Sequence, residues 1–189
     1  MVSMPTAKIP HSLELVIDFV NTLDPDVPAD AFATPEGLGA WLESRGLLDA
    51  ADLPLREGDR REALQLRDAL LALMLAHNGM PADAQAAREL DRVARRGGLG
   101  VQFRSDGSAP LAPRGEGFAA ALAAVVVPAA EAVRDGSWQR VKACRADDCR
   151  WAFYDRSRNR SGVWCDMAVC GNRAKVRAYR RRGTAAGPG

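Results

Sequence analysis

The sequence predicts an α+β fold: a mainly helical N-terminal domain with one β-hairpin, then a small C-terminal module of hairpin and helix. Three observations support this prediction. Apolar residues recur at helical spacing through most of residues 1–137. A segment near residues 101–112 has a glycine turn between two extended runs. From Trp138 onward, leucine disappears and all four cysteines appear. We therefore expect domains at 1–137 and 138–183 and a flexible tail at 184–189.

Two helices are expected before residue 47. Ser12 can cap the first, which runs to about Thr22. One face of this helix is apolar and consists of Leu13, Val16, Ile17 and Val20. A buried strand is the alternative, because the run is rich in branched residues. The second helix has Thr34 as its cap and Pro35 in its first turn, and it ends at Gly46.

The middle of the chain predicts two further helices. Residues 60–77 form the clearest amphipathic pattern, with leucines recurring on one face. Asn78 and Gly79 end this helix, and Pro81 opens another that continues to Arg96. Gly97 and Gly98 then end the second of these helices.

A hairpin and an alanine-rich helix complete the expected N-terminal domain. Residues 101–104 and 109–112 form the arms of the hairpin, and Gly107 lies in its turn. The helix covers residues 115–134, and Pro128 is expected to kink it. Its apolar run is too short and too rich in alanine to predict a membrane span.

Charge is distributed unevenly along the chain, whose net charge is +2. Residues 140–182 contain 13 Lys/Arg and 4 Asp/Glu, which gives a charge of +9. Residues 1–139 contain 13 Lys/Arg and 20 Asp/Glu, which gives a charge of −7. Such asymmetry is expected when one part of a protein contacts an anionic polymer. Because no segment has the pattern of a targeting signal, we expect a cytoplasmic protein that does not associate with membranes.

The four cysteines form two close pairs. Cys144 and Cys149 are followed, after a hairpin-length stretch, by Cys165 and Cys170. This layout is typical of a structural zinc site with four thiolate ligands, and the reducing cytoplasm disfavours the alternative of two disulfides. A segment of strand character follows the first pair and a helix from about Ala174 to Arg182 follows the second, which predicts a treble-clef-like zinc finger. Four closed sulfur ligands would leave no position for catalysis.

Basic residues surround the cysteines. The candidates for nucleic-acid contact are Arg156, Arg158, Arg160, Arg173, Lys175, Arg177, Arg180 and Arg181. Arginines with interleaved aromatic residues suit phosphate contact and base stacking, which favours DNA as a partner. The alternatives are a solvated surface, or a clamp that docks on the acidic domain or on another protein. For Arg173 in particular, either a phosphate contact or a clamp on Asp155 fits the sequence.

The segment around the second cysteine pair resembles the CGNR zinc finger, named for Cys170-Gly171-Asn172-Arg173. The Cys144–Cys149 segment resembles the first half of that finger, and residues 11–135 resemble the ABATE domain. The resemblance implies a bacterial, stress-linked transcription regulator that holds one zinc ion and contacts DNA through its finger. It also implies that the N-terminal domain can sense a ligand.

Three polar residues accompany the first apolar helix and are the candidates for a small-molecule pocket: Asp18, Asn21 and Thr22. The alternative is a satisfied polar network at a helix end. Neither histidine has a nucleophile or acid at a recognisable spacing, and we find no phosphate-binding loop, so we do not expect an enzyme. A homodimer is plausible because a single finger reads few bases.

Overall fold

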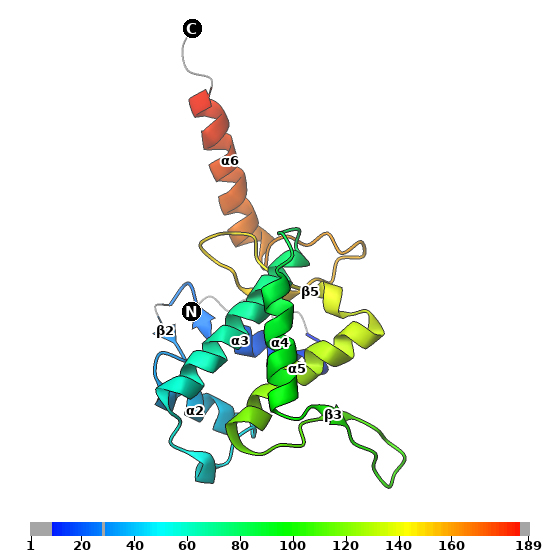
Figure 1. The fold of residues 1–189 in the computed structure, drawn as a ribbon. Helices are drawn as coiled ribbons and strands as arrows, with labels where there is room; N and C mark the ends of the chain where they lie inside the picture. Colours follow the sequence, from blue (N-terminus) through cyan, green and yellow to red (C-terminus); the bar gives the residue numbers. More distant parts are fainter. Residues whose placement is uncertain (1–8, 28, 186–189) are drawn as a thin grey trace.

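The structure is a computed structural model that describes residues 9–27 and 29–185, with the side chains of 181–185 excepted. Five longer helices form the body, and a sixth lies in the C-terminal module (Figure 1). The helices are α1 (His11–Val20), α2 (Pro35–Ser44), α3 (Glu57–Ala76), α4 (Ala84–Arg96), α5 (Gly117–Asp135) and α6 (Asn172–Ala185). The strands form three antiparallel two-stranded ladders, so the expected α+β class is confirmed. They are β1 (Leu23–Asp24) with β2 (Ala29–Asp30), β3 (Gly100–Val101) with β4 (Leu111–Ala112), and β5 (Val141–Ala143) with β6 (Ala152–Tyr154).

Helix α1 is the apolar segment for which a strand was the alternative. It starts two residues earlier than the Ser12 cap predicts, because Pro10 takes the N-cap position and Ser12 lies in the first turn. The buried side chains are Leu13, Val16, Ile17, Phe19 and Val20. The predicted apolar face is therefore buried together with Phe19, and α1 contributes to the core of the body.

Helix boundaries in the body follow local capping signals. In α2, the Thr34 side chain accepts a hydrogen bond from the Gly37 N–H, and a proline occupies the first turn, as predicted. In α4, the Asp83 side chain caps the helix by accepting from the Gln85 N–H, so the helix begins at Ala84 instead of Pro81. Sequence periodicity located both helices, and the cap residues determine where they begin.

Helix α5 packs against α1 and α4 and contributes much of the core. Among the described residues it is the helix that is long and apolar enough to cross a membrane, by length and composition alone. Its buried residues include Leu122, Val125 and Val126, which share one core cluster with α1 and α3. Pro128 lies inside the helix and is buried. We therefore interpret α5 as a core helix.

The hairpin expected at residues 101–112 is present and shorter than predicted. Its ladder pairs Gly100 with Ala112 and Val101 with Leu111. Beyond the ladder, the N–H of Arg104 donates to the Ser108 carbonyl, which continues the pairing to the turn. The β1–β2 ladder lies between α1 and α2 and pairs Leu23 with Asp30 and Asp24 with Ala29.

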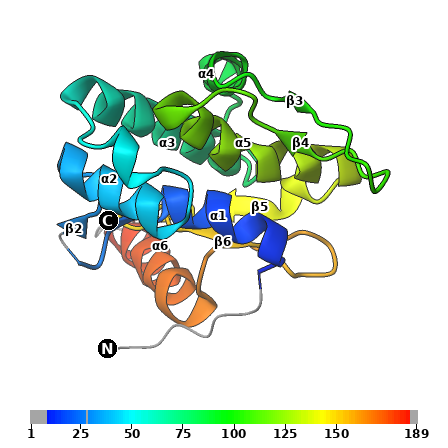
Figure 2. The ribbon, with the colours of Figure 1, turned by 90° about the horizontal axis from the view of Figure 1, so that it is seen from below.

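The C-terminal module packs directly on the body. Strand β5 contacts α3, and β6 contacts α1 (Figure 2). Trp138, Val141, Ala143 and Ala152 belong to the same hydrophobic core as the body helices. The expected boundary at residue 137 therefore separates two segments that share one core. Helix α6 projects away from that core and extends into the expected tail as far as Ala185, and residues 186–189 lie outside the description (Figure 1).

Candidate metal centre and nucleic-acid interface

The four cysteine sulfurs converge on one point. All four Sγ atoms lie within 4.8 Å of one another. The Cys165 Sγ lies 3.6 Å from that of Cys149 and 3.7 Å from that of Cys170, and all four thiols are free. A disulfide would require about 2.05 Å. Tetrahedral zinc with bonds of about 2.3 Å places its sulfurs about 3.8 Å apart, which fits the separations seen here.

The thiols influence one another because they are so close. Hydrogen bonds from the Cys149 and Cys165 thiols lower the pKa of Cys144 to about 2. The same crowding raises the pKa of Cys149 to about 12, first through its bond to Cys144, and it raises that of Cys165 as well. Without a cation, this cluster therefore stabilises one thiolate at the expense of its neighbours. A zinc ion supplies the charge that allows all four to be thiolates, so the chain carries a site for one structural zinc.

Local backbone geometry brings each pair to the centre. The Cys144 N–H donates to the Trp151 carbonyl, which turns the chain tightly after β5. In the second pair, the Asp166 carboxylate accepts from the N–H groups of Ala168 and Val169 and so caps a π-helical turn, Met167–Gly171, ahead of α6. A Cβ on Gly171 would approach the sulfur of the exposed Met167 side chain to 2.5 Å, so a larger residue here would require that side chain to move.

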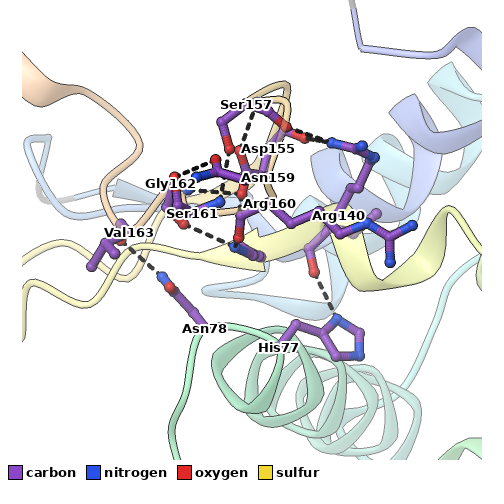
Figure 3. A network of polar contacts seen from close by, with 12 residues as sticks. His77, Asn78, Arg140, Asp155, Ser157, Asn159, Arg160, Ser161, Gly162 and Val163 are labelled. Carbon is purple, nitrogen blue, oxygen red and sulfur yellow. Dashed lines mark hydrogen bonds and ion pairs between the residues drawn. The ribbon is translucent and has the colours of Figure 1, made fainter.

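A buried ion pair organises the loop between the cysteine pairs. The Nζ of Lys142 lies 2.7 Å from the Asp155 carboxylate, and these side chains are 5% and 2% exposed. Lys142 also donates to the carbonyls of Arg160 and Gly162, and the Asp155 carboxylate accepts from the N–H of Gly162 (Figure 3). Burial acts to raise the pKa of Asp155, but the hydrogen bonds from Lys142 and Ser157 lower it to about 2. The loop at residues 155–162 is therefore tied to β5.

Two asparagines of the body support the metal centre. Asn78, just after α3, donates from Nδ2 to the carbonyls of Ala143 and Val163, at 2.8 Å each (Figure 3). These carbonyls lie next to Cys144 and two residues before Cys165, so one side chain supports both cysteine pairs. The side-chain amide of Asn21 donates from Nδ2 to the Ala152 carbonyl at 3.0 Å and accepts at Oδ1 from the Ala152 N–H at 2.7 Å, as a neighbouring strand would.

The three residues expected to line a ligand pocket have protein partners. Asp18 forms an ion pair with Arg45 at 2.7 Å. Thr22 donates to the Phe19 carbonyl and accepts from Arg67, and Asn21 pairs with the finger as described above. Ligand binding by these residues stays a prediction. Their partners reveal a structural connection between α1 and the finger that the sequence did not show.

Most candidates for nucleic-acid contact lie on the surface. Arg156, Arg158 and Arg160 are exposed in the loop between the cysteine pairs, and Lys175, Arg177 and Arg180 are exposed on α6. The side chain of Arg181 lies outside the described residues. Arg173 is half-buried at the base of α6. There it forms ion pairs with Asp148 at 3.3 Å and Asp26 at 4.0 Å, in place of the clamp on Asp155 that was one of its two alternatives.

Asp148 is the acidic residue that sequence reasoning missed. It lies in the first cysteine pair and contacts the guanidinium groups of Arg173 and Arg177, at 3.3 and 3.0 Å. Hydrogen bonding to Arg177 lowers its pKa. The spacing of Asp148 in the sequence gave no signal for these contacts, because they depend on how α6 packs beside the first pair.

A helical body and a four-cysteine centre that share one core define a zinc-finger protein. Residues 140–183 match the CGNR zinc finger, and residues 13–136 match ABATE, a family described as "Putative stress-induced transcription regulator". The chain belongs to the ABATE family and carries a CGNR finger at its C-terminus. No curated protein matches it.

Proposed function

We propose that this protein regulates transcription by binding DNA through α6 and the arginine loop at residues 156–160. The family is described as a transcription regulator, and the zinc centre fixes both segments on one module. Helix α6 carries the observation on which the proposal depends. The helix projects away from the body (Figure 1), and its Lys175, Arg177 and Arg180 are exposed.

The alternative function is a zinc-stabilised clamp whose basic surface is covered by the acidic body. That arrangement requires Arg177 and Arg180 to be buried against residues 1–139. The Arg177 side chain is instead 44% exposed, and it forms an ion pair with Asp148 of the finger itself. Arg173 reaches the body through an ion pair with Asp26. These contacts favour an accessible basic surface over a docked one.

Further parts of the proposal follow from this function. One matching family is described as a transcription regulator and the other as a zinc finger, and neither description names an enzyme. We therefore assign no catalytic role to any residue. The protein would act in the cytoplasm, where thiols stay reduced and DNA is accessible. Homodimerisation, which would double the number of base contacts, stays a prediction.

A binding assay with a random-sequence DNA duplex pool tests the proposal. The zinc-loaded protein should bind the pool at low salt, and chelation of zinc should abolish binding because α6 follows directly from the second cysteine pair. Arg177→Ala with Arg180→Ala should weaken binding strongly. The matched control is Arg61→Ala with Arg104→Ala, which removes two exposed arginines of the body and should have little effect. Undetectable binding by the zinc-loaded protein would favour the clamp.

A further inference from the structure

We propose that a hollow along α6, the α6 groove, binds residues 23–27 of a second copy of this chain, so that two copies form a dimer with reciprocal contacts. The α6 groove has a volume of about 580 Å³. It runs along α6 and the π-helical turn before it, and Asp148 of the first cysteine pair contributes to its wall. Its lining combines apolar and cationic side chains, namely Val169, Val176, Arg173, Arg177 and Arg180.

Helix α6 has little packing of its own. It projects from the body, and the element that it contacts most is the π-helical turn at its own base (Figure 1). A helix of 14 residues is marginal in water unless an apolar face is packed. Val169 and Val176, which line the groove, are 37% and 48% exposed. Phosphate contacts use polar and charged groups, whereas an apolar face bordered by charges is typical of a protein interface. The α6 groove therefore suits a protein segment.

A second exposed apolar segment, residues 23–27, has the complementary charge. Leu23 and Val27 are 51% and 52% exposed, and Asp24 and Asp26 lie between them. This segment has no Lys or Arg, whereas α6 has six and no acidic residue. Among the described residues, six of the ten exposed large apolar side chains belong to this segment or to α6 and its π-helical turn. The two surfaces therefore match in apolar character and in charge.

The two surfaces are neighbours on one chain, which favours a second copy as the occupant. The Asp26 carboxylate lies 4.0 Å from the Arg173 guanidinium, at the base of α6, while Val176 farther along the helix stays exposed. Asp148 borders both the α6 groove and a hollow that Leu23 lines. Complementary surfaces that lie side by side can pair twice across a two-fold axis, each segment on the groove of the other copy. Such a dimer covers both apolar surfaces at once.

The dimer would compete with DNA. The α6 groove contains Arg177 and Arg180, the arginines of the proposed DNA surface, and the carboxylates of residues 23–27 would take the place of phosphate groups. This pairing therefore differs from a dimer that doubles the base contacts, because it covers the arginines that such a dimer would use. The competition rests on the proposed function, whereas dimerisation itself does not.

Sedimentation velocity of the zinc-loaded full chain, from micromolar to submillimolar concentration, measures the dimer. Two charge reversals test the contact: Asp24→Arg with Asp26→Arg, and Arg177→Glu with Arg180→Glu. Each reversal places like charges together in both contacts of its own dimer, so the dissociation constant should rise about tenfold or more. An equimolar mixture should restore dimers, because both contacts of the mixed pair then join opposite charges. Arg61→Glu with Arg104→Glu, two exposed arginines of the body, is the control and should leave the dimer unchanged.

Val176→Ser tests the apolar part of the contact from an exposed position, and it keeps the test decisive if a charge reversal fails to fold. It should raise the dissociation constant of the dimer severalfold. A wild-type dimer that weakens in these variants and returns in the mixture supports the proposal. A monomer at every concentration, a dimer unchanged by the reversals or by Val176→Ser, or a mixture of folded variants that stays monomeric overturns it.

A labelled DNA duplex separates this proposal from the proposed function. Dimers that bind no DNA would refute only the proposed function, and DNA binding by a protein that is monomeric throughout would refute only the dimer. Where both occur, saturating duplex should dissociate the dimer, and the reversal of Asp24 and Asp26 should strengthen DNA binding at protein concentrations where the wild type is dimeric. Dimers that stay intact on saturated DNA would refute the competition.

Discussion

The Asp148 carboxylate lies 3.0 Å from the Arg177 guanidinium, across the gap between the first cysteine pair and α6. The same carboxylate reaches Arg173, one turn earlier on the helix. A DNA phosphate would form charge-assisted hydrogen bonds with the same two guanidinium groups. Asp148 therefore occupies cationic groups that DNA would use, and it competes with phosphate for them.

Removing this competitor should strengthen DNA binding. Asp148→Asn should raise the affinity about two- to fivefold at low salt, because exposed ion pairs are weak and screened. Fluorescence anisotropy with a labelled duplex measures the change. Asp147→Asn is the control, since Asp147 forms its ion pair with Arg150 of the same segment. An unchanged or lower affinity for Asp148→Asn would mean that the carboxylate positions α6 for binding.

Asn78 should contribute to both stability and zinc affinity. Asn78→Ala leaves the carbonyls of Ala143 and Val163 without this donor, and we expect a loss of about 1–3 kcal/mol in the free energy of unfolding. Zinc affinity should fall about tenfold, because groups that support metal ligands have effects of this size. Competition with a chromophoric chelator measures it. Asn159→Ala, in the exposed loop, should leave zinc affinity unchanged, and an equal loss there would argue against a specific role for Asn78.

The Lys142–Asp155 pair should show strong coupling. Lys142→Met leaves a buried carboxylate without its cation, and it should lower the free energy of unfolding by about 3–5 kcal/mol. Adding Asp155→Asn removes that charge and keeps one acceptor oxygen for the two N–H groups, of Ser157 and Gly162, that donate to the carboxylate, so the double variant should regain part of the loss. Urea denaturation of the zinc-loaded proteins measures both. Strictly additive losses would show that the pair is not coupled.

His77 should make stability depend on pH. It lies against Trp138 and donates to the Val141 carbonyl, and burial lowers its pKa below 6.5. The unfolded chain therefore binds more protons than the folded one just below pH 6.5, and stability falls as the pH decreases through that region. His77→Gln should reduce this loss between pH 7.5 and pH 5.5, on a scale of about one titrating group. Equal pH dependence in both proteins would contradict this interpretation of His77.

Local patterns in the sequence were sufficient for much of the fold and for the metal ligands. The cysteine spacing predicted the four-sulfur centre, because a metal site needs few residues at short separations. Amphipathic periodicity located α3, proline, glycine and alanine signals located α4 and α5, and Thr34 and Pro35 marked the start of α2 as the structure has it. These signals lie within a few residues of the features that they predict.

Contacts between distant segments could not be predicted in the same way. Asn21 was noted as a polar residue on a buried segment, but its partner Ala152 lies 131 residues away. The short strand β5 has a buried lysine at its centre, which a sequence pattern favours for the surface. Asp148 contacts Arg177 only because α6 packs beside the first cysteine pair. Each of these depends on tertiary packing rather than on local spacing.

The dependence of DNA affinity on salt tests the central claim most directly, that α6 binds phosphate groups through its arginines. For the zinc-loaded wild type, the logarithm of the association constant should fall linearly with the logarithm of salt concentration. Arg177→Ala with Arg180→Ala should reduce that slope by about two, because each lost phosphate contact removes about one. The same slope in wild type and variant would contradict the account.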